Sequence, residues 1–178
     1  MTTRSLARSL ASATGLAVTA ALAISSSAAE PTGQAAAKRI TAAGVDGVKL
    51  GMTHARLRQL GLVGPIRKGC ELGGPNTRSA RLRAPLSGQV NYTLTTPRRV
   101  TDITIRGGAT ARGVGIGAKI PVIKAAFPKA IVDHSTDQTF QLTLVRIPKS
   151  GGGRIAFGVS TITKRTTLIG VPRIAFCE

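Results

Sequence analysis

The chain has 178 residues, and its 25 Lys and Arg against 7 Asp and Glu give a formal net charge of +18. This balance excludes an acidic or neutral cytosolic protein. Hydrophobic residues make up 42% of the chain, which is enough for one domain or two small ones, and the scarcity of aromatic side chains predicts a mostly aliphatic core.

The first 29 residues have the pattern of a secretory signal peptide. Two arginines precede an apolar run at 10–24, and small residues fill 25–29. We therefore expect cleavage between Ala29 and Glu30 and a secreted protein, extracellular or associated with the cell wall. A membrane anchor is the alternative, but the run is shorter than the roughly 20 apolar residues of a span, so we expect no span in the mature form.

The two cysteines, Cys70 and Cys177, are the whole complement of the chain. Outside the reducing cytosol such a pair favours a disulfide, which would close a loop of 177 − 70 = 107 residues. A loop of this length corresponds to about 4–5 kcal/mol in the chain-entropy model. A metal site and a nucleophilic thiol are the alternatives, but there is no CxxC, and His54 and His134 have no patterned spacing to either cysteine.

The mature chain contains two similar stretches 66 residues apart. Glycine-rich turns at 47–53 and 113–119 each open into a short amphipathic helix, predicted at 54–60 and at 120–127. Thr53 is the expected cap of the first helix, and Pro121 fits the first turn of the second. We predict a signal peptide at 1–29, a flexible segment at 30–39, a first repeat at 40–112 and a second repeat at 113–178.

Beyond each helix the apolar pattern changes to a period of two, which is typical of strands. The predicted strands are 79–84, 89–95 and 100–106 in the first repeat, and 140–144, 154–160, 168–171 and 174–176 in the second. The expected fold class is α+β, with two tandem helix-strand-strand-strand repeats, antiparallel sheets and a disulfide between the repeats. A chance match of glycine-rich turns is the alternative to duplication.

The stretch ITAAGVDGVKLGMTHARLRQLG at 40–61, its echo TARGVGIGAKIPVIKAAFP at 110–128 and the C-terminal Cys177 carry a resemblance. The chain resembles secreted actinobacterial proteins of the β-lactamase-inhibitory-protein type. The small SmpA/OmlA-like outer-membrane-assembly lipoproteins have similar helix-plus-sheet units. The resemblance implies a tandem helix-plus-sheet fold that binds a protein on an exposed sheet face.

Catalytic patterns are weak in this sequence. The run Asp133-His134-Ser135 holds the residue types of a hydrolase triad, but triads are assembled in space rather than in consecutive residues. The glycines before Lys119 fit neither of the common nucleotide-binding loops, and a turn requirement explains them. We expect no enzyme activity, no catalytic residues, no metal and no cofactor.

The basic excess is the remaining functional signal. Two hypotheses follow: a protein-binding module whose polar strand face engages an acidic extracellular protein, and a basic envelope protein that binds anionic cell-wall polymers. An Arg-rich composition that serves only solubility is the alternative to both. Sequence-specific nucleic-acid binding is not expected, because the known motifs and stacking aromatics are lacking. The candidate binding residues are Arg81, Arg83, Gln89, Asn91, Thr93, Arg98, Arg99 and Arg106.

Overall fold

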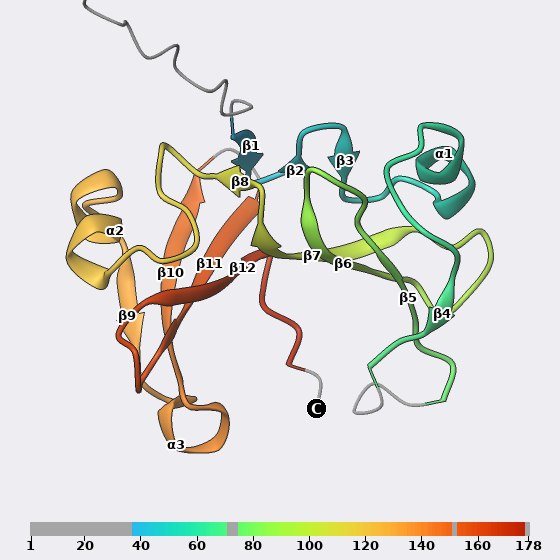
Figure 1. Ribbon diagram of the computed structural model, residues 1–178. Coiled ribbons are helices and arrows are strands. Elements are labelled where there is room, and N and C mark those ends of the chain that lie inside the picture. Colours follow the sequence, from blue (N-terminus) through green and yellow to red (C-terminus); the bar gives the residue numbers. More distant parts are fainter. Residues whose placement is uncertain (1–36, 71–74, 151–152, 177–178) are drawn as a thin grey trace, which may run out of the picture. The chain divides into compact units, whose positions relative to one another are not determined.

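Eight of the strands pair into one antiparallel sheet (Figure 1). The computed structural model describes residues 37–70, 75–150 and 153–176, all within one compact unit, Ala35–Glu178. In the order in which they lie side by side, the strands are β4 (Arg67–Lys68), β5 (Arg78–Arg81), β6 (Ser87–Tyr92), β7 (Val100–Gly107), β12 (Thr166–Val171), β11 (Gly153–Ser160), β10 (Leu142–Ser150) and β9 (Ile131–Asp133).

Two short helices lie on one face of this sheet, one over each half (Figure 1). Helix α1 (His54–Gln59) begins after Thr53, whose hydroxyl accepts a hydrogen bond from the Arg56 N–H at 3.3 Å. Helix α2 (Ile120–Ala126) has a proline in its first turn, where the missing N–H costs no bond. Each helix is too short to be stable alone and is held by the residues it buries against the sheet.

A second, four-stranded sheet lies on the same side as the helices (Figure 1). Its strands, in spatial order, are β3 (Val48–Lys49), β2 (Gly44–Val45), β1 (Lys38–Thr41) and β8 (Ala109–Thr110). Because β1 pairs with β8 in parallel, the start of the described chain is joined to the segment that links the two halves.

The main core lies between the eight-stranded sheet and the helices. Leu57 of α1 and Ile123 of α2 are fully buried against inward-facing strand residues such as Phe157. In one row across the first half, Ala80 pairs with Val90 and Val90 with Ile103. The corresponding row of the second half is Val145, Phe157 and Ile169. The core is mostly aliphatic, as the composition predicts.

The opposite face of the sheet carries a second and smaller apolar cluster. We call this face the helix-free face, because α1 and α2 both lie on the other side (Figure 1). The cluster contains Leu144, Ala156 and Leu168 from the second half of the sheet, and Ile174 from the segment that follows β12. The rings of Phe140 and Phe176 stack beside it, with centroids 4.2 Å apart. The C-terminal segment therefore covers the second half of the helix-free face.

Several features of the first half have a counterpart about 66 residues later in the chain. Helix α1 corresponds to α2, and the glycine after each four-residue turn, Gly51 or Gly117, has a left-handed φ of 80° or 86°. Their N–H groups donate to Val100 and Thr166, again 66 residues apart, at 2.8 Å in both cases. Counted from either edge of the eight-stranded sheet towards its middle, the first half contributes β5, β6 and β7, and the second half contributes β10, β11 and β12 in the corresponding positions.

The predicted α+β class with antiparallel pairing is confirmed. Two strand predictions are wrong. Residues 174–176 form no strand, because this segment packs by its side chains across the helix-free face, and Phe140 ends a short helix, α3 (Asp137–Phe140), before β10 begins. The chain also enters β1 at Lys38, two residues before the expected start of the folded part.

Several sequence predictions lie outside the described residues. These are the signal peptide at 1–29, the cleavage point at Ala29 and Glu30, most of the segment 30–39, and Cys177. Within the described ranges, no helix is long and apolar enough to cross a membrane.

Candidate binding surface

The first half of the helix-free face is polar, because strand alternation sends apolar residues to the core and their neighbours to the other side. Arg81 of β5 lies opposite Gln89 of β6, and Gln89 lies opposite Thr104 of β7. Arg106 is two residues beyond Thr104 on the same strand and therefore shares its face. Arg67 of β4 lies opposite Ser79, which puts a third arginine at the edge of this row.

These side chains line a groove of about 680 Å³, which we call the basic groove. Its basic wall consists of Arg67, Lys68, Arg81 and Arg106, with Gln89 and Thr104 between them. Its apolar wall consists of Phe140, Leu142, Leu168, Ile174 and Phe176. A second hollow of about 410 Å³ adjoins the groove and is lined by Arg67, Arg81, Gln89 and Arg106 as well.

The arginines of the basic groove have no carboxylate partner among the described residues. The ion pairs in the described part of the chain lie elsewhere and join Lys38 to Asp46, His134 to Asp137 and Arg146 to Asp133. Arg67, Arg81 and Arg106 are exposed. Their positive charge is consequently open to solvent and to an anionic group on another molecule.

One described carboxylate, Asp102, lies on the first half of this face, and it is used within the fold. It is 3% exposed and accepts hydrogen bonds from Asn91 Nδ2 at 2.6 Å and from Thr101 Oγ1 at 3.0 Å. Asp102 lines a neighbouring hollow together with Arg78 and Arg173, which neither Arg81 nor Arg106 lines. Its carboxylate is therefore engaged by hydrogen bonds of the fold and does not pair with the arginines of the basic groove.

Three of the eight predicted binding residues come together in this groove: Arg81, Gln89 and Arg106. Asn91 shares the face but bonds to Asp102, as described above. Arg83 lies beyond β5, which ends at Arg81, and it does not line the groove.

The remaining predicted residues stabilise turns. Arg98 donates to the carbonyls of Thr93, at 2.7 Å, and of Leu94, and the Thr93 hydroxyl donates to the Thr95 carbonyl at 3.1 Å. Arg99 donates to the Gly51 carbonyl at 3.1 Å. The predicted cluster at the β6–β7 turn is thus engaged with backbone acceptors.

Sequence reasoning missed Arg67, Lys68 and Thr104. The strand that carries Arg67 and Lys68 has two residues, too few for a period to be visible, and its pairing with β5 spans an intervening loop. The alternation of β7 would have found Thr104, since Ile103 and Ile105 are both core residues.

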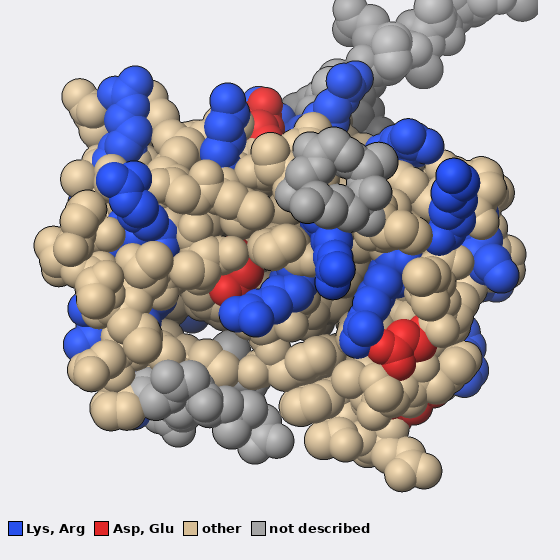
Figure 2. All heavy atoms as spheres, turned by 180° about the vertical axis from the view of Figure 1, so that it is seen from behind, with Lys and Arg blue, Asp and Glu red and all other residues tan. Residues whose placement is uncertain are grey.

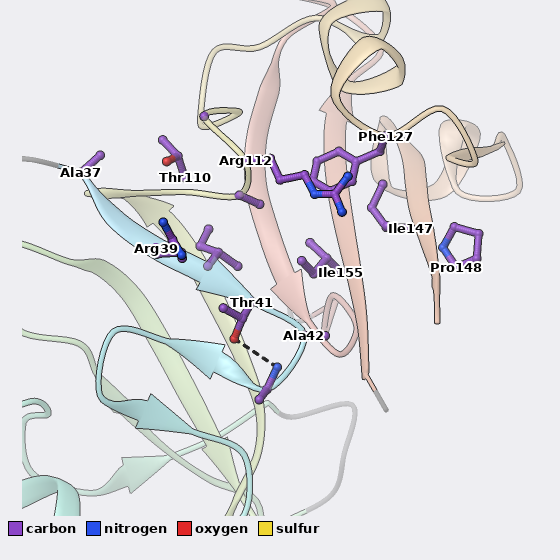
Figure 3. A pocket seen from close by; sticks show the side chains of 14 residues that line it. Ala37, Arg39, Thr41, Ala42, Thr110, Arg112, Phe127, Ile147, Pro148 and Ile155 are labelled. Atoms are coloured by element: carbon purple, nitrogen blue, oxygen red, sulfur yellow. Dashed lines mark hydrogen bonds between the residues drawn. The ribbon is translucent and has the colours of Figure 1, made fainter. Parts of the chain in front are cut away.

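The larger groove of the molecule, about 880 Å³, lies on the other side of the sheet, between the small sheet, α2 and the edge of β10 and β11 (Figure 3). Arg39 and Arg112 lie near its apolar side chains, Phe127, Ile147 and Ile155. The Arg112 guanidinium stands 5.2 Å from the centre of the Phe127 ring and donates to the Ala126 carbonyl at 3.3 Å. Because Arg112 is engaged in the fold, we favour the basic groove as the binding surface.

The hydrolase-like run at 133–135 divides into two separate contacts. His134 Nδ1 lies 2.8 Å from Asp137 Oδ2, whereas the Ser135 N–H donates to Asp133 at 2.9 Å. The Ser135 hydrogen bonds lower the pKa of Asp133, and the His134 hydrogen bond lowers the pKa of Asp137. Across the described residues, no group of three His, Cys, Asp or Glu is placed to hold a metal ion.

Compared with protein-family models, with curated proteins and with solved structures, the chain has no significant match.

Proposed function

We propose that this protein is an exported, non-catalytic module that binds an acidic partner protein through the basic groove. The observation that carries the proposal is the convergence of Arg67, Arg81 and Arg106, from three strands, on one groove without a described carboxylate to neutralise them. Arginines in this state suit carboxylates on another molecule, because the guanidinium can bind a carboxylate through two hydrogen bonds.

The second wall of the groove supports a protein as the partner. Protein interfaces combine apolar side chains at their centre with polar and charged groups around them, and arginine is enriched among the residues that carry binding energy. The basic groove places arginines opposite Phe140, Leu168 and Phe176. A polymer recognised by charge alone would make no use of that apolar wall.

The alternative function is binding of an anionic cell-wall polymer. Lys and Arg side chains are spread across the molecule seen from behind, while Asp and Glu appear there at few places (Figure 2). After removal of Arg4 and Arg8 with the signal peptide, the net charge would be 23 − 7 = +16. Such a distributed charge attracts polyanions without a shaped site.

Export and the Cys70–Cys177 disulfide are parts of the same proposal. The Cys70 sulfur lies 3.1 Å from the carbonyl oxygen of Phe176, the residue that precedes Cys177. The bridge would fix the C-terminal segment at the edge of the basic groove. The intact mature protein is expected to weigh two hydrogen atoms less than its reduced form, and two titratable thiols would refute the bridge.

We also infer that the halves 40–112 and 113–178 are copies of one unit. The inference is supported by turn contacts that recur at an offset of 66: Arg99 donates to the Gly51 carbonyl and Arg165 to the Gly117 carbonyl, each at 3.1 Å. The resemblance to inhibitory proteins stays a prediction.

A binding experiment with matched variants tests the proposed function. The mature protein, the variant with Arg81→Glu and Arg106→Glu, and a control with Lys49→Glu and Lys124→Glu on the other side are used to capture culture-supernatant proteins and to co-sediment with cell walls of the source organism, across a salt series. We expect one captured protein to be lost with the groove variant only. Equal, steep losses with salt for all variants, on cell walls alone, would support the polymer instead.

A further inference from the structure

The floor of the basic groove contains a buried hydroxyl without a partner. Thr104 is 3% exposed, it lines the groove, and its Oγ1 makes no hydrogen bond to any described group. A buried polar atom left in this state destabilises the fold. Such an atom is able to accept a hydrogen bond from, or donate one to, a water molecule or a group of a bound partner.

Most neighbours of Thr104 on this face are groups that bind anions. The exception is Asp102, two residues away along β7, whose carboxylate accepts hydrogen bonds from Asn91 and Thr101. Gln89 lies directly opposite it on β6, and Arg81 lies opposite Gln89 on β5, so Arg81 is two strands, about 10 Å, from Thr104 at the backbone. Arg106 lies two residues along β7, about 7 Å away. Both arginine side chains are long enough to reach a single anion held above Gln89 and Thr104.

The other side of Thr104 is occupied by the C-terminal segment. The cross-strand neighbour of Thr104 on β12 is Gly170, and the neighbour of Gly170 on β11 is Ala156. The small residues at these two positions let the C-terminal segment pass close to the sheet, since a methyl group on Gly170 would lie 2.3 Å from the Arg173 carbonyl oxygen. The groove is thus bounded by arginines on one side and by this segment on the other.

The apolar wall indicates what accompanies the anion. Leu168 is buried and Leu142 half-buried, and the stacked rings of Phe140 and Phe176 are half-buried beside them. A ligand that places only charge in the groove would leave this wall in water. An apolar group next to the anion would cover the exposed parts of Phe140, Leu142 and Phe176 and remove them from water, which is favourable.

We propose that the basic groove binds an acidic side chain together with an adjacent apolar side chain of an extended partner segment, the carboxylate lying between Arg81 and Arg106 above Thr104, and the apolar side chain lying against Leu168 and the Phe140–Phe176 pair. This inference rests on the proposed function, because it names the chemistry by which that partner is recognised. No covalent step is involved.

Capped tetrapeptides test the inference directly. Calorimetric titration of the mature protein compares Gly-Asp-Phe-Gly with Gly-Asn-Phe-Gly, which lacks the charge, and with Gly-Asp-Ser-Gly, which lacks the apolar group. We expect the first peptide to bind about tenfold more tightly than either of the others, a ratio that corresponds to roughly 1.4 kcal/mol. Inorganic phosphate is added as a competitor that has charge without an apolar neighbour, and we expect it to compete only weakly.

Two variants separate recognition from folding. Thr104→Val removes the unpartnered hydroxyl and keeps the shape, so the midpoint of unfolding should stay the same or rise while the affinity for the Asp-Phe peptide falls about tenfold. The control, Thr166→Val, removes a hydroxyl that donates to the Ala118 carbonyl at 2.9 Å outside the groove. It should lower the unfolding midpoint and leave peptide affinity unchanged.

The outcomes distinguish this inference from the function on which it rests. Equal affinity for the Asp-Phe and Asn-Phe peptides, competition by phosphate as strong as that of the Asp-Phe peptide, or no effect of Thr104→Val on binding overturns the inference. If the groove variant with Arg81→Glu and Arg106→Glu still loses a captured protein while the peptides do not discriminate, the proposed function stands without it. If neither protein capture nor peptide binding is affected by the groove variant, both the inference and the proposed function are wrong.

Discussion

The two halves of the helix-free face carry side chains of different chemistry: one is mainly polar and the other mainly apolar. Next to the core row of each half lies one row on this face. In the first half that row is Ser79, Asn91 and Asp102, and in the second half it is Leu144, Gly158 and Leu168. The polar row is held by the hydrogen bond between Asn91 and Asp102, whereas the apolar row is covered by Ile174.

This difference in side-chain chemistry explains why only the first half of the face is available to bind a partner. An apolar row left in water would lose its burial energy, and the chain itself supplies the cover through the segment after β12. The polar row is also buried at Ser79 and Asp102, but its carboxylate is satisfied by hydrogen bonds within the fold, and the arginines of the neighbouring row stay exposed. The second half of the face is therefore covered by the C-terminal segment, whereas the first half leaves its arginines accessible to a partner.

The largest effect should come from placing the residue of the first half in the second. Leu168→Asp would bury a carboxylate between Leu144 and Ile174, and an uncompensated buried charge costs about 3–5 kcal/mol. Urea unfolding followed by circular dichroism measures the loss. Ile162→Asp, at a position 73% exposed, is the control and should change stability by less than about 0.5 kcal/mol. Equal effects of the two variants would contradict the closed state of this half.

The reciprocal test removes the carboxylate of the first half. Asp102→Ala deletes the acceptor of the Asn91 and Thr101 hydrogen bonds and leaves the Asn91 amide unpaired, which should cost about 2–3 kcal/mol. Asp46→Ala breaks an exposed pair with Lys38 and should cost no more than about 1 kcal/mol. If the two variants unfold at the same urea concentration, the polar row does not hold this half together.

A smaller effect is expected where the C-terminal segment crosses the sheet. Gly170→Ala would place a methyl group 2.3 Å from the Arg173 carbonyl and force the segment away, at a cost of about 1–3 kcal/mol. In Gly64→Ala the nearest atom outside the neighbouring residues is 3.7 Å away, so that variant should fold with nearly unchanged stability. The midpoints of thermal unfolding of the two variants measure this difference. A Gly170→Ala variant as stable as wild type would mean that the C-terminal segment is not packed closely against β12.

The sequence predicts the elements of this fold better than their pairing. Helices α1 and α2 begin at His54 and Ile120, where the glycine turns and the period place them, and the strands 100–106 and 154–160 are close to β7 and β11. Local patterns record which residues face inward. They do not record which strand lies beside which, so the central contact of β7 with β12 could not be foreseen.

The same limit applies to the binding surface. Arg81, Gln89 and Arg106 belong to strands with visible alternation, and the prediction that they share a face rests on that alternation. Arg67 reaches the groove only through the pairing of a two-residue strand with β5. The apolar residues Ile174 and Phe176 have the composition of a strand, but tertiary packing on the helix-free face decides their conformation.

The smallest effect tests how far the equivalence of the two halves extends. Arg99 and Arg165 are both exposed and each donates to a turn glycine carbonyl at 3.1 Å, so Arg99→Ala and Arg165→Ala should each lower stability by about 0.5–1 kcal/mol. Because the two turns lie in different halves and share no partner, the double variant should lose the sum. Urea unfolding of the three variants measures this directly. If only one of the two single variants lowers the free energy of unfolding, the two matching hydrogen bonds contribute unequally to stability. The difference between the halves would then extend from the helix-free face to the turns that precede the helices.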